Sequence, residues 1–339
     1  MTTSAASRSP LRVLACPDTL KGVLAASDAA AALAAGLARA GVDPEQIPLA
    51  DGGEGTADAL RAALGGEWRR ARVSDPLGRE VEARFLMLAD GRAVVESAEA
   101  IGLWRLTPEE RDPLRASSRG LGELILAAAE AGAAEIVVTL GGSATVDGGS
   151  GMREVVDALP VPVAVAADVR NPLLGERGAA RVFGPQKGAS PKQVEELERR
   201  LAAMEELRAV AELPGAGAAG GLGAALAALG ATVAPGIELV LEAVRFAERL
   251  EGAAAAVTGE GQVDRSSAEG KVPAGVAAAC ARAGVACIVF GGRVERGTAA
   301  PLYALGASAV FTLSGDPDES REDLADLGEA VGRLLQRNG

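Results

Sequence analysis

EIVVTLGGSATVDGG, residues 135–149, shows the pattern that recurs along this chain. An apolar run, typical of a strand buried on both faces, ends abruptly in a loop of glycine, serine and aspartate. Four other runs, 11–16, 47–50, 163–167 and 253–258, end in similar glycine-containing or acidic loops, and further strands are expected at 286–290 and 309–313. Helical stretches alternate with them at 27–40, 56–64, 118–131, 191–209, 237–250 and 273–283. This alternation predicts parallel α/β sheets.

Residues 68–99 depart from that alternation. The runs 68–73, 80–88 and 93–97 alternate apolar and polar side chains and are separated by turn sequences, which is typical of antiparallel strands. We therefore expect a second domain inserted into the first. The expected division is a discontinuous domain of residues 1–65 and 236–339 and an inserted domain of residues 66–235, the chain returning between 190 and 250.

Composition and charge exclude several classes of protein. With 48% hydrophobic residues and three cysteines in 339 residues, the chain is neither disordered nor a disulfide scaffold, and its sparse thiols fit a reducing cytosol. A net charge of −12 without a basic run argues against nucleic-acid binding. The N-terminal segment has no apolar signal-peptide core, and the uncharged stretch 213–237 is rich in Gly, Ala and Pro, so we expect a loop and a buried helix there. The expectation is a cytoplasmic protein without membrane or nucleic-acid partners.

The basic and imidazole side chains narrow the chemistry further. The chain has no histidine, which excludes His-based triads and His metal sites. Of 34 basic residues only four are lysine, and Lys21, Lys187 and Lys271 each adjoin a glycine. Lysine is a compact charge suited to phosphate oxygens, so these positions indicate a phosphate or carboxylate site. The alternative is that lysine simply favours loops.

Acidic residues lie on several of the strand ends. Ligands of open α/β sheets bind beyond the carboxyl ends of the strands, and glycine lets backbone amides approach an anion. Carboxylates beside such amides repel phosphate unless a cation intervenes, and Mg²⁺ binds one or two carboxylates together with phosphates. Ordinary turns remain the alternative for any single loop. The acidic residues concerned are Asp51, Glu54, Asp147, Asp168, Glu260 and Asp264.

A second alternative arises from residues 215–220, GAGAAG, which match the dinucleotide-binding pattern G-x-G-x-x-G. An NAD(P)-dependent oxidoreductase would use this loop. A helical stretch, 191–209, precedes it where a dinucleotide-binding fold requires a strand. The pattern GxxxxGK[ST] is absent from the sequence, so a P-loop is excluded.

Together these loops resemble the bacterial glycerate kinase family of the glyoxylate-pathway type. The resemblance implies ATP-dependent phosphorylation of D-glycerate, favouring 2-phosphoglycerate, in a cleft between a flavodoxin-like parallel-sheet domain and an inserted mixed α/β domain. A monomer or homodimer is expected. The matching stretches are CPDTLKG (16–22), LADGGEGT (49–56), LGGSATVDGGSGM (140–152), DVRNPLLG (168–175), FGPQKGAS (183–190), PGAGAAGGLGA (214–224) and TGEGQVDRSSAEGKVPAGVA (258–277).

The resemblance supplies roles for these residues as a hypothesis. Lys21, Lys187 and Lys271 would contact phosphate and the glycerate carboxylate, with Lys21 and Lys187 counted as catalytic. Mg²⁺ would be held by Asp51 and Glu54, or by Glu260 and Asp264. The general base would be Asp168 or, second, Asp147. Amides and side chains expected to bind substrate or phosphate come from Gly141, Gly142, Ser143, Asn171, Gly52 and Gly53.

Two features depart from the family pattern. Only Arg153–Pro162 separates the DGG loop from the next strand, where relatives carry a longer stretch, and Glu269 stands where many relatives have His. The short segment keeps open a third possibility, a relative that binds glycerate without catalysis.

Overall fold

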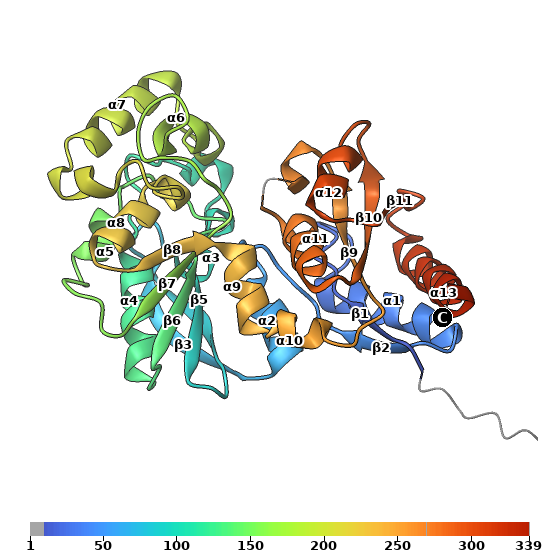
Figure 1. The fold of residues 1–339 in the computed structure, drawn as a ribbon. Coiled ribbons are helices and arrows are strands. Elements are labelled where there is room, and N and C mark those ends of the chain that lie inside the picture. Colours follow the sequence, from blue (N-terminus) through green and yellow to red (C-terminus); the bar gives the residue numbers. More distant parts are fainter. Residues whose placement is uncertain (1–9, 269, 339) are drawn as a thin grey trace, which may run out of the picture. The chain divides into compact units, whose positions relative to one another are not determined.

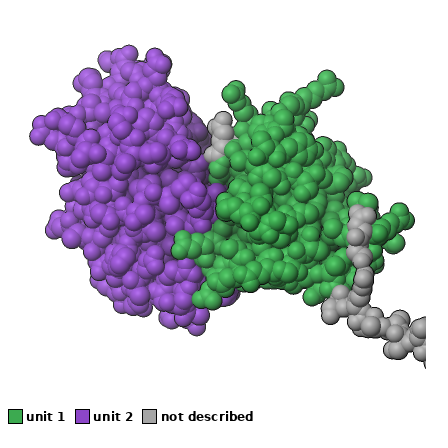
Figure 2. Space-filling view, viewed as in Figure 1, with its two compact units in different colours: residues 1–50, 241–339 green, residues 51–240 purple. Residues whose placement is uncertain are grey.

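The computed structural model describes residues 10–268 and 270–338, so the N-terminal segment and Glu269 lie outside the described residues. The chain forms two compact units, residues 1–50 with 241–339 (unit 1) and residues 51–240 (unit 2), coloured separately in Figure 2. Each unit contains its own sheet, and the second is inserted in sequence into the first, so the expected α/β class with an inserted sheet is confirmed.

Unit 1 is built on a five-stranded sheet in which every pair is parallel. The strands lie in the order β2-β1-β9-β10-β11 (Figure 1). If the strands of this unit are renumbered 1 to 5 in chain order, their order across the sheet is 2-1-3-4-5. The direction in which successive strands are added changes between β1 and β9, and ligands of such sheets bind at that point. The bounds are β1 Arg12–Ala15, β2 Asp43–Gln46, β9 Ala255–Val263, β10 Ala286–Val294 and β11 Ala309–Thr312.

Helices of unit 1 pack against this sheet and against each other. Helix α1 (Ala26–Arg39) lies against α13 (Ser320–Asn338), and α11 (Val272–Ala283) lies on β9 and β10. Two glycines permit the close approach of α1 and α13, because a Cβ on Gly36 would lie 1.8 Å from the Ala325 carbonyl oxygen and one on Gly328 2.4 Å from that of Leu33. The remaining helices are α10 (Phe246–Leu250) and α12 (Ala299–Leu305).

Unit 2 contains a mixed six-stranded sheet in the order β3-β4-β5-β6-β7-β8. The β3–β4 and β4–β5 pairs are antiparallel, as expected for residues 68–97, and the other pairs are parallel. Helix α4 (Arg119–Glu130) packs along β3–β6, and α8 (Leu222–Ala228) packs on β7 and β8, around the larger apolar core. The strands are β3 Glu67–Ser74, β4 Glu80–Met87, β5 Arg92–Glu96, β6 Glu135–Thr139, β7 Val163–Ala167 and β8 Thr232–Pro235.

The helices of unit 2 begin with α2 (Thr56–Leu64), which packs against β4 and β5. That packing assigns residues 51–65 to unit 2, whereas the sequence division assigned them to the first domain. Helix α9 (Gly236–Ala243) crosses the boundary at residue 240. The others are α3 Ser97–Ile101, α4 Arg119–Glu130, α5 Ser150–Arg153, α6 Ala179–Phe183, α7 Pro191–Ala202 and α8 Leu222–Ala228.

Local predictions differ from the structure in several places. The strand expected at 253–258 does not end in a loop there, because β9 continues to Val263 and Glu260 pairs within it with Gly291 of β10. The run 47–50 is not a strand; β2 is the polar segment before it, although Ile47 N–H still donates to the Ala15 carbonyl at 2.8 Å. The stretch 237–250 is two helices, because Arg245 adopts a left-handed φ of 52° between them. The stretch 191–209 continues as a helix only to Ala202. Among the described residues, no helix is both long enough and apolar enough to cross a bilayer.

Replacing Gly36 with Ala should lower the free energy of unfolding by about 2 kcal/mol or more, because the new Cβ cannot fit against the Ala325 carbonyl without separating α1 from α13. Urea denaturation measures this change. Ala35→Ser, on the exposed side of the same helix, is the control and should stay within about 0.5 kcal/mol of wild type. Equal stability of the two variants would contradict the packing described above.

Candidate active site

Two glycine loops of unit 2 contact each other at the carboxyl ends of its strands. Loop 51–55 precedes α2, and loop 141–149 follows β6. A Cβ on Gly141 would lie 2.9 Å from both the Gly53 Cα and the Glu54 nitrogen. A Cβ on Gly142 would lie 3.1 Å from Glu54 Oε2. The structure therefore brings together the predicted residues of these loops, and glycine is required where their backbones meet.

The carboxylates of Asp51 and Asp168 both lie close to Gly53, beside the contact between the two loops. Asp51 Oδ1 accepts a hydrogen bond from the Gly53 N–H at 3.1 Å. A Cβ built on Gly53 would lie 3.1 Å from Asp51 Oδ1 and 3.7 Å from Asp168 Oδ2. Asp51 is half-buried and Asp168, directly after β7, is exposed. This pairing was not anticipated, since Asp51 was expected to act with Glu54.

A divalent cation fits this pair of carboxylates. In the described part of the chain, no three His, Cys, Asp or Glu side chains are arranged to hold a metal ion. Mg²⁺ does not require such a cluster, because it takes one or two carboxylates and completes its shell with water and phosphate oxygens. Asp51 and Asp168 supply suitable hard oxygen donors. The other proposed pair is less suitable, because Glu260 Oε2 lies 3.5 Å from Lys271 Nζ.

Lys187 is buried against the second loop. Its Nζ donates to Ser143 Oγ at 3.1 Å and to the Thr145 carbonyl at 2.9 Å, and only 4% of the residue is exposed. Burial lowers the pKa of Lys187 to about 7, while the charge of Asp147 acts in the opposite direction. An anion bound nearby would raise the pKa of Lys187, because an opposite charge favours the protonated form. Binding of an anion would therefore increase the positive charge of this lysine.

The backbone of the 141–144 segment leaves several donors available to a ligand. The Gly142 carbonyl accepts from the Leu103 N–H at 2.8 Å, and the Ala144 N–H donates to the Ile101 carbonyl at 2.8 Å. Over the described residues, no protein group accepts a hydrogen bond from the N–H of Gly141, Gly142 or Ser143. Consecutive amides of this kind can bind an anion.

Asp147 is turned toward the protein. Its carboxylate accepts from the Ser118 N–H and Oγ, both at 2.8 Å, and from the Gly149 and Gly151 N–H groups, both at 3.1 Å. These four bonds hold the starts of α4 and α5. They favour a positioning role for Asp147 over proton transfer.

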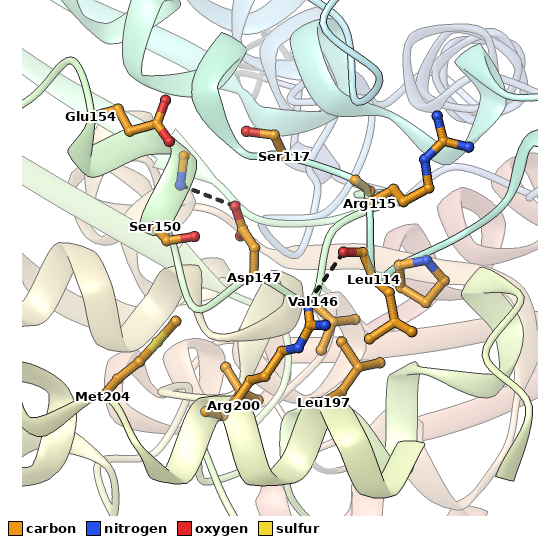
Figure 3. A pocket seen from close by; sticks show the side chains of 14 residues that line it. Leu114, Arg115, Ser117, Val146, Asp147, Ser150, Glu154, Leu197, Arg200 and Met204 are labelled. Atoms are coloured by element: carbon orange, nitrogen blue, oxygen red, sulfur yellow. Dashed lines mark hydrogen bonds between the residues drawn. The ribbon is translucent and has the colours of Figure 1, made fainter. Parts of the chain in front are cut away.

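Asp147 also lines a pocket of about 250 Å³ in unit 2, shown in Figure 3. Its walls come from residues 113–117, from α5 and from α7, where Arg200 Nη1 donates to the Leu114 carbonyl at 3.4 Å. None of the other predicted site residues lines this pocket. It is therefore a hollow beside the second loop, separate from the carboxylates at Gly53.

The predicted site residues of unit 1 gather around the carboxyl-terminal part of β9, and Glu260 lies within that strand. Glu260 is buried and pairs with Lys271, which precedes α11. A Cβ on Gly261 would lie 3.3 Å from the Lys21 nitrogen, so the two loops adjoin. The Asp264 N–H donates to Ser267 Oγ at 2.9 Å. This cluster occupies the crevice position typical of a 2-1-3-4-5 sheet.

Two other predicted residues make contacts within the protein. Asn171 Nδ2 donates to the Arg177 carbonyl at 2.7 Å. Gly52 has a φ of +92°, and a Cβ there would lie 2.6 Å from the Gly236 Cα. Both residues shape the loops around Asp51 and Asp168.

The glycines of residues 215–220 serve packing. The preceding residues form α7 and a 3₁₀ segment (Glu205–Val210), so no strand leads into the loop. A Cβ on Gly217 would lie 2.3 Å from the Pro172 carbonyl oxygen, and one on Gly220 would lie 2.0 Å from that of Thr145. Because these glycines are covered by protein backbone, the loop cannot serve as a dinucleotide fingerprint, and this geometry overturns the oxidoreductase alternative.

Sequence reasoning missed two residues at the end of β5. Glu96 is 4% exposed and accepts from the Ala57 N–H at 3.0 Å, and Ser97 Oγ donates to the Gly141 carbonyl at 3.3 Å. Burial raises the pKa of Glu96 to about 7. Glu96 could have been found in the sequence as an acidic residue at the end of an expected strand, which is the pattern that identified Asp168.

Comparison with known proteins accounts for these loops. The model of the glycerate kinase family matches residues 13–159 and 157–337. The chain belongs to the glycerate kinase family. Curated relatives include a glycerate kinase from Halalkalibacterium halodurans, 39% identical over 343 residues that cover 89% of this chain and 90% of that protein. The glycerate 2-kinase of Escherichia coli K12 is 41% identical over 309 residues, 79% of this chain and 81% of that protein.

A solved structure agrees with this assignment. A crystal structure from Salmonella typhimurium LT2, of a protein assigned as glycerate kinase 2, superposes with a TM-score of 0.85 at 34% identity. It covers 97% of this chain and 99% of that chain. The two family matches meet at residues 157–159, within the Arg153–Pro162 segment identified as short. The predicted family is confirmed.

Ionisation of Lys187 should make stability depend on pH. Its folded-state pKa of about 7 lies below the unfolded value of 10.5, so stability is complete above pH 10.5 and decreases as the pH falls toward 7, by at most about 5 kcal/mol. Lys187→Met should remove this contribution and flatten the rise in unfolding free energy between pH 7 and pH 9. Urea titrations at both pH values measure the slope.

The matched control is Lys192→Met, since Lys192 is an exposed lysine on α7. It should retain the wild-type slope. A Lys187→Met slope equal to that of wild type would mean that Lys187 is not buried as described.

Proposed function

We propose that this member of the glycerate kinase family transfers the γ-phosphoryl group of ATP to the 2-hydroxyl of D-glycerate, assisted by Mg²⁺. Glycerate kinase activity and ATP use follow from the family. The choice of the 2-hydroxyl is supported by the relative named glycerate 2-kinase, at 41% identity. The observation that carries the site assignment is the pair of carboxylates, Asp51 and Asp168, beside the amides of Gly141–Ser143.

Phosphoryl transfer requires positioning and charge neutralisation more than covalent chemistry. When bound, Mg²⁺ would neutralise phosphate charge. Asp51 is the proposed ligand, because its carboxylate is fixed by the Gly53 N–H. Asp168 is the proposed acceptor of the hydroxyl proton, because it is exposed to an incoming substrate and lies beside Asp51. Asp147 is disfavoured as the base, since four hydrogen bonds already engage its carboxylate.

The amides of the second loop and the lysines would bind the anionic groups. Gly141, Gly142 and Ser143 offer N–H donors, and Lys187 lies directly behind them on Ser143 and Thr145. An anion at these amides would raise the pKa of Lys187 and charge it, which strengthens binding. In unit 1, Lys21 and Lys271 are the proposed phosphate ligands, and Lys271 would exchange its contact with Glu260 for phosphate. We also infer a flavodoxin-like unit 1, supported by its 2-1-3-4-5 strand order.

Incubation with ATP, Mg²⁺ and D-glycerate should produce a new phosphomonoester signal in proton-coupled phosphorus NMR. Transfer to the 2-hydroxyl predicts a doublet, because that phosphate couples to a single proton, whereas transfer to the 3-hydroxyl predicts a triplet. L-glycerate is the control for stereochemistry. ATP left intact while D-glycerate still binds, measured by calorimetry, would favour the non-catalytic alternative.

The two carboxylates should respond differently to substitution. Asp168→Asn should lower kcat by about 10²–10⁴-fold at saturating Mg²⁺, as expected for loss of a general base. Asp51→Asn should mainly raise the Mg²⁺ concentration needed for half-maximal activity. Asp157→Asn, an exposed residue of the short segment, is the control and should leave both quantities unchanged. Identical Mg²⁺ and kcat effects of the first two variants would contradict the separate roles.

A further inference from the structure

We propose that Glu96, the last residue of β5, and Ser97, the first residue of α3, are positioning residues that hold the two glycine loops of the site together. Neither residue belongs to the loops. The Glu96 side chain accepts a hydrogen bond from the start of α2, and the Ser97 side chain donates one to the second loop. The consequence for catalysis rests on the proposed roles of Asp51 and of the Gly141–Ser143 amides.

Glu96 supplies a cap that α2 lacks in its own sequence. The residue before this helix is Gly55, in a left-handed conformation with a φ of 91°, and it has no side chain to accept from the first helical N–H groups. Glu96 Oε1 accepts from the Ala57 N–H at 3.0 Å instead. A carboxylate at a helix N-terminus is stabilised by the unpaired N–H groups and the helix dipole. A strand of the sheet therefore fixes where α2 begins.

The cap reaches Asp51 through a short series of hydrogen bonds. Thr56, next to the capped Ala57, donates from Oγ1 to the Gly53 carbonyl at 2.8 Å. The Gly53 N–H in turn donates to Asp51 Oδ1 at 3.1 Å. Displacing the start of α2 would therefore displace the carboxylate proposed to bind the metal.

Ser97 acts on the other loop in the same way. Its side chain is buried, and its Oγ donates to the Gly141 carbonyl at 3.3 Å. The following residues continue this attachment, because Gly102 and Ser143 form an isolated antiparallel bridge. Since Glu96 and Ser97 are consecutive, the end of one strand fixes both loops at the point where Gly53 meets Gly141.

The surroundings of Glu96 are mostly acidic. Asp58 on α2 and Glu99 on α3 both raise its pKa, in addition to the larger effect of burial. Arg84 on β4 pairs with both of them, at 2.9 Å from Asp58 and 2.7 Å from Glu99, and so offsets their charge. Burying an acid beside other acids lowers the stability of the fold. The presence of Glu96 at this position therefore agrees with a positioning role for its hydrogen bond to Ala57.

Hydrogen exchange tests the attachment without relying on activity. In Glu96→Ala, the hydrogen-bonded amides at both loops should exchange at least tenfold faster than in wild type. They are Gly53 and Ala57 at the first loop and Leu103 and Ala144 at the second. Glu96→Gln keeps a carbonyl oxygen that can accept from Ala57 and should restore slow exchange. Ser97→Ala should accelerate exchange mainly at Leu103 and Ala144, whose N–H groups bond across the second loop. Asp75→Asn is the matched control, because Asp75 is also a buried acid that accepts backbone N–H groups but lies in the β3–β4 turn.

Kinetics then connects the attachment to the site. Glu96→Ala should raise the Mg²⁺ concentration for half-maximal activity at least fivefold, Glu96→Gln should restore it, and Asp75→Asn should leave it unchanged even if it lowers the melting temperature. The proposal is overturned if both loops exchange in Glu96→Ala as they do in Asp75→Asn, or if they loosen while the Mg²⁺ dependence stays at the wild-type value. Wild-type protein that does not phosphorylate glycerate would reject the proposed function alone, and the exchange data would still decide whether Glu96 and Ser97 hold the loops.

Discussion

The close contact between Gly53 and Gly141 is the constraint on which the candidate site depends. Two loops distant in sequence meet there with no room for a Cβ, so only glycine fits at the contact. Asp51 and Asp168 lie beside Gly53, and Glu54 lies against Gly142. A site that must bring carboxylates and backbone amides close to the same anion is thereby assembled from residues distant in sequence.

The second loop, residues 141–149, is also fixed by side chains from other elements of unit 2. Lys187 donates to Ser143 and Thr145, and the Asp147 carboxylate binds the first N–H groups around α4 and α5. Burying a lysine without a carboxylate directly opposite is costly, and the lowered pKa of Lys187 reflects that cost. An anion bound at the adjacent amides would offset that cost, because it favours the charged form of Lys187. The scarcity of lysine in this chain fits such specialised use.

Strongly apolar strands could be predicted from the sequence, and weakly patterned elements could not. β6 and β7 are apolar runs buried on both faces, whereas β2 is the polar segment Asp43–Gln46, which strand propensity disfavours and which forms only because it pairs with β1 at the sheet edge. The same division applies to the site. Lys187 was identified by its rarity, but Glu96 was not, because neither its burial nor its contact with Ala57, 39 residues away, leaves a mark in local spacing. Glycine patterns were ambiguous for a related reason: Gly220 and Gly141 look alike in sequence, and only the structure shows that Gly220 is covered by the Thr145 carbonyl.

The short segment after Met152 is compatible with an intact site. The two family matches meet at residues 157–159, after the last residue that contacts Asp147 and before β7 begins. The hydrogen bonds that fix the second loop come from Ser118, Gly149 and Gly151, which all precede the short segment. Asp168 follows β7, which pairs with β6 over Val163–Ala166 and with β8 over Ala164–Ala167. The attachments of the second loop and of Asp168 therefore do not come from residues 153–162, because they are made by Ser118, Gly149 and Gly151 and by the pairing of β7.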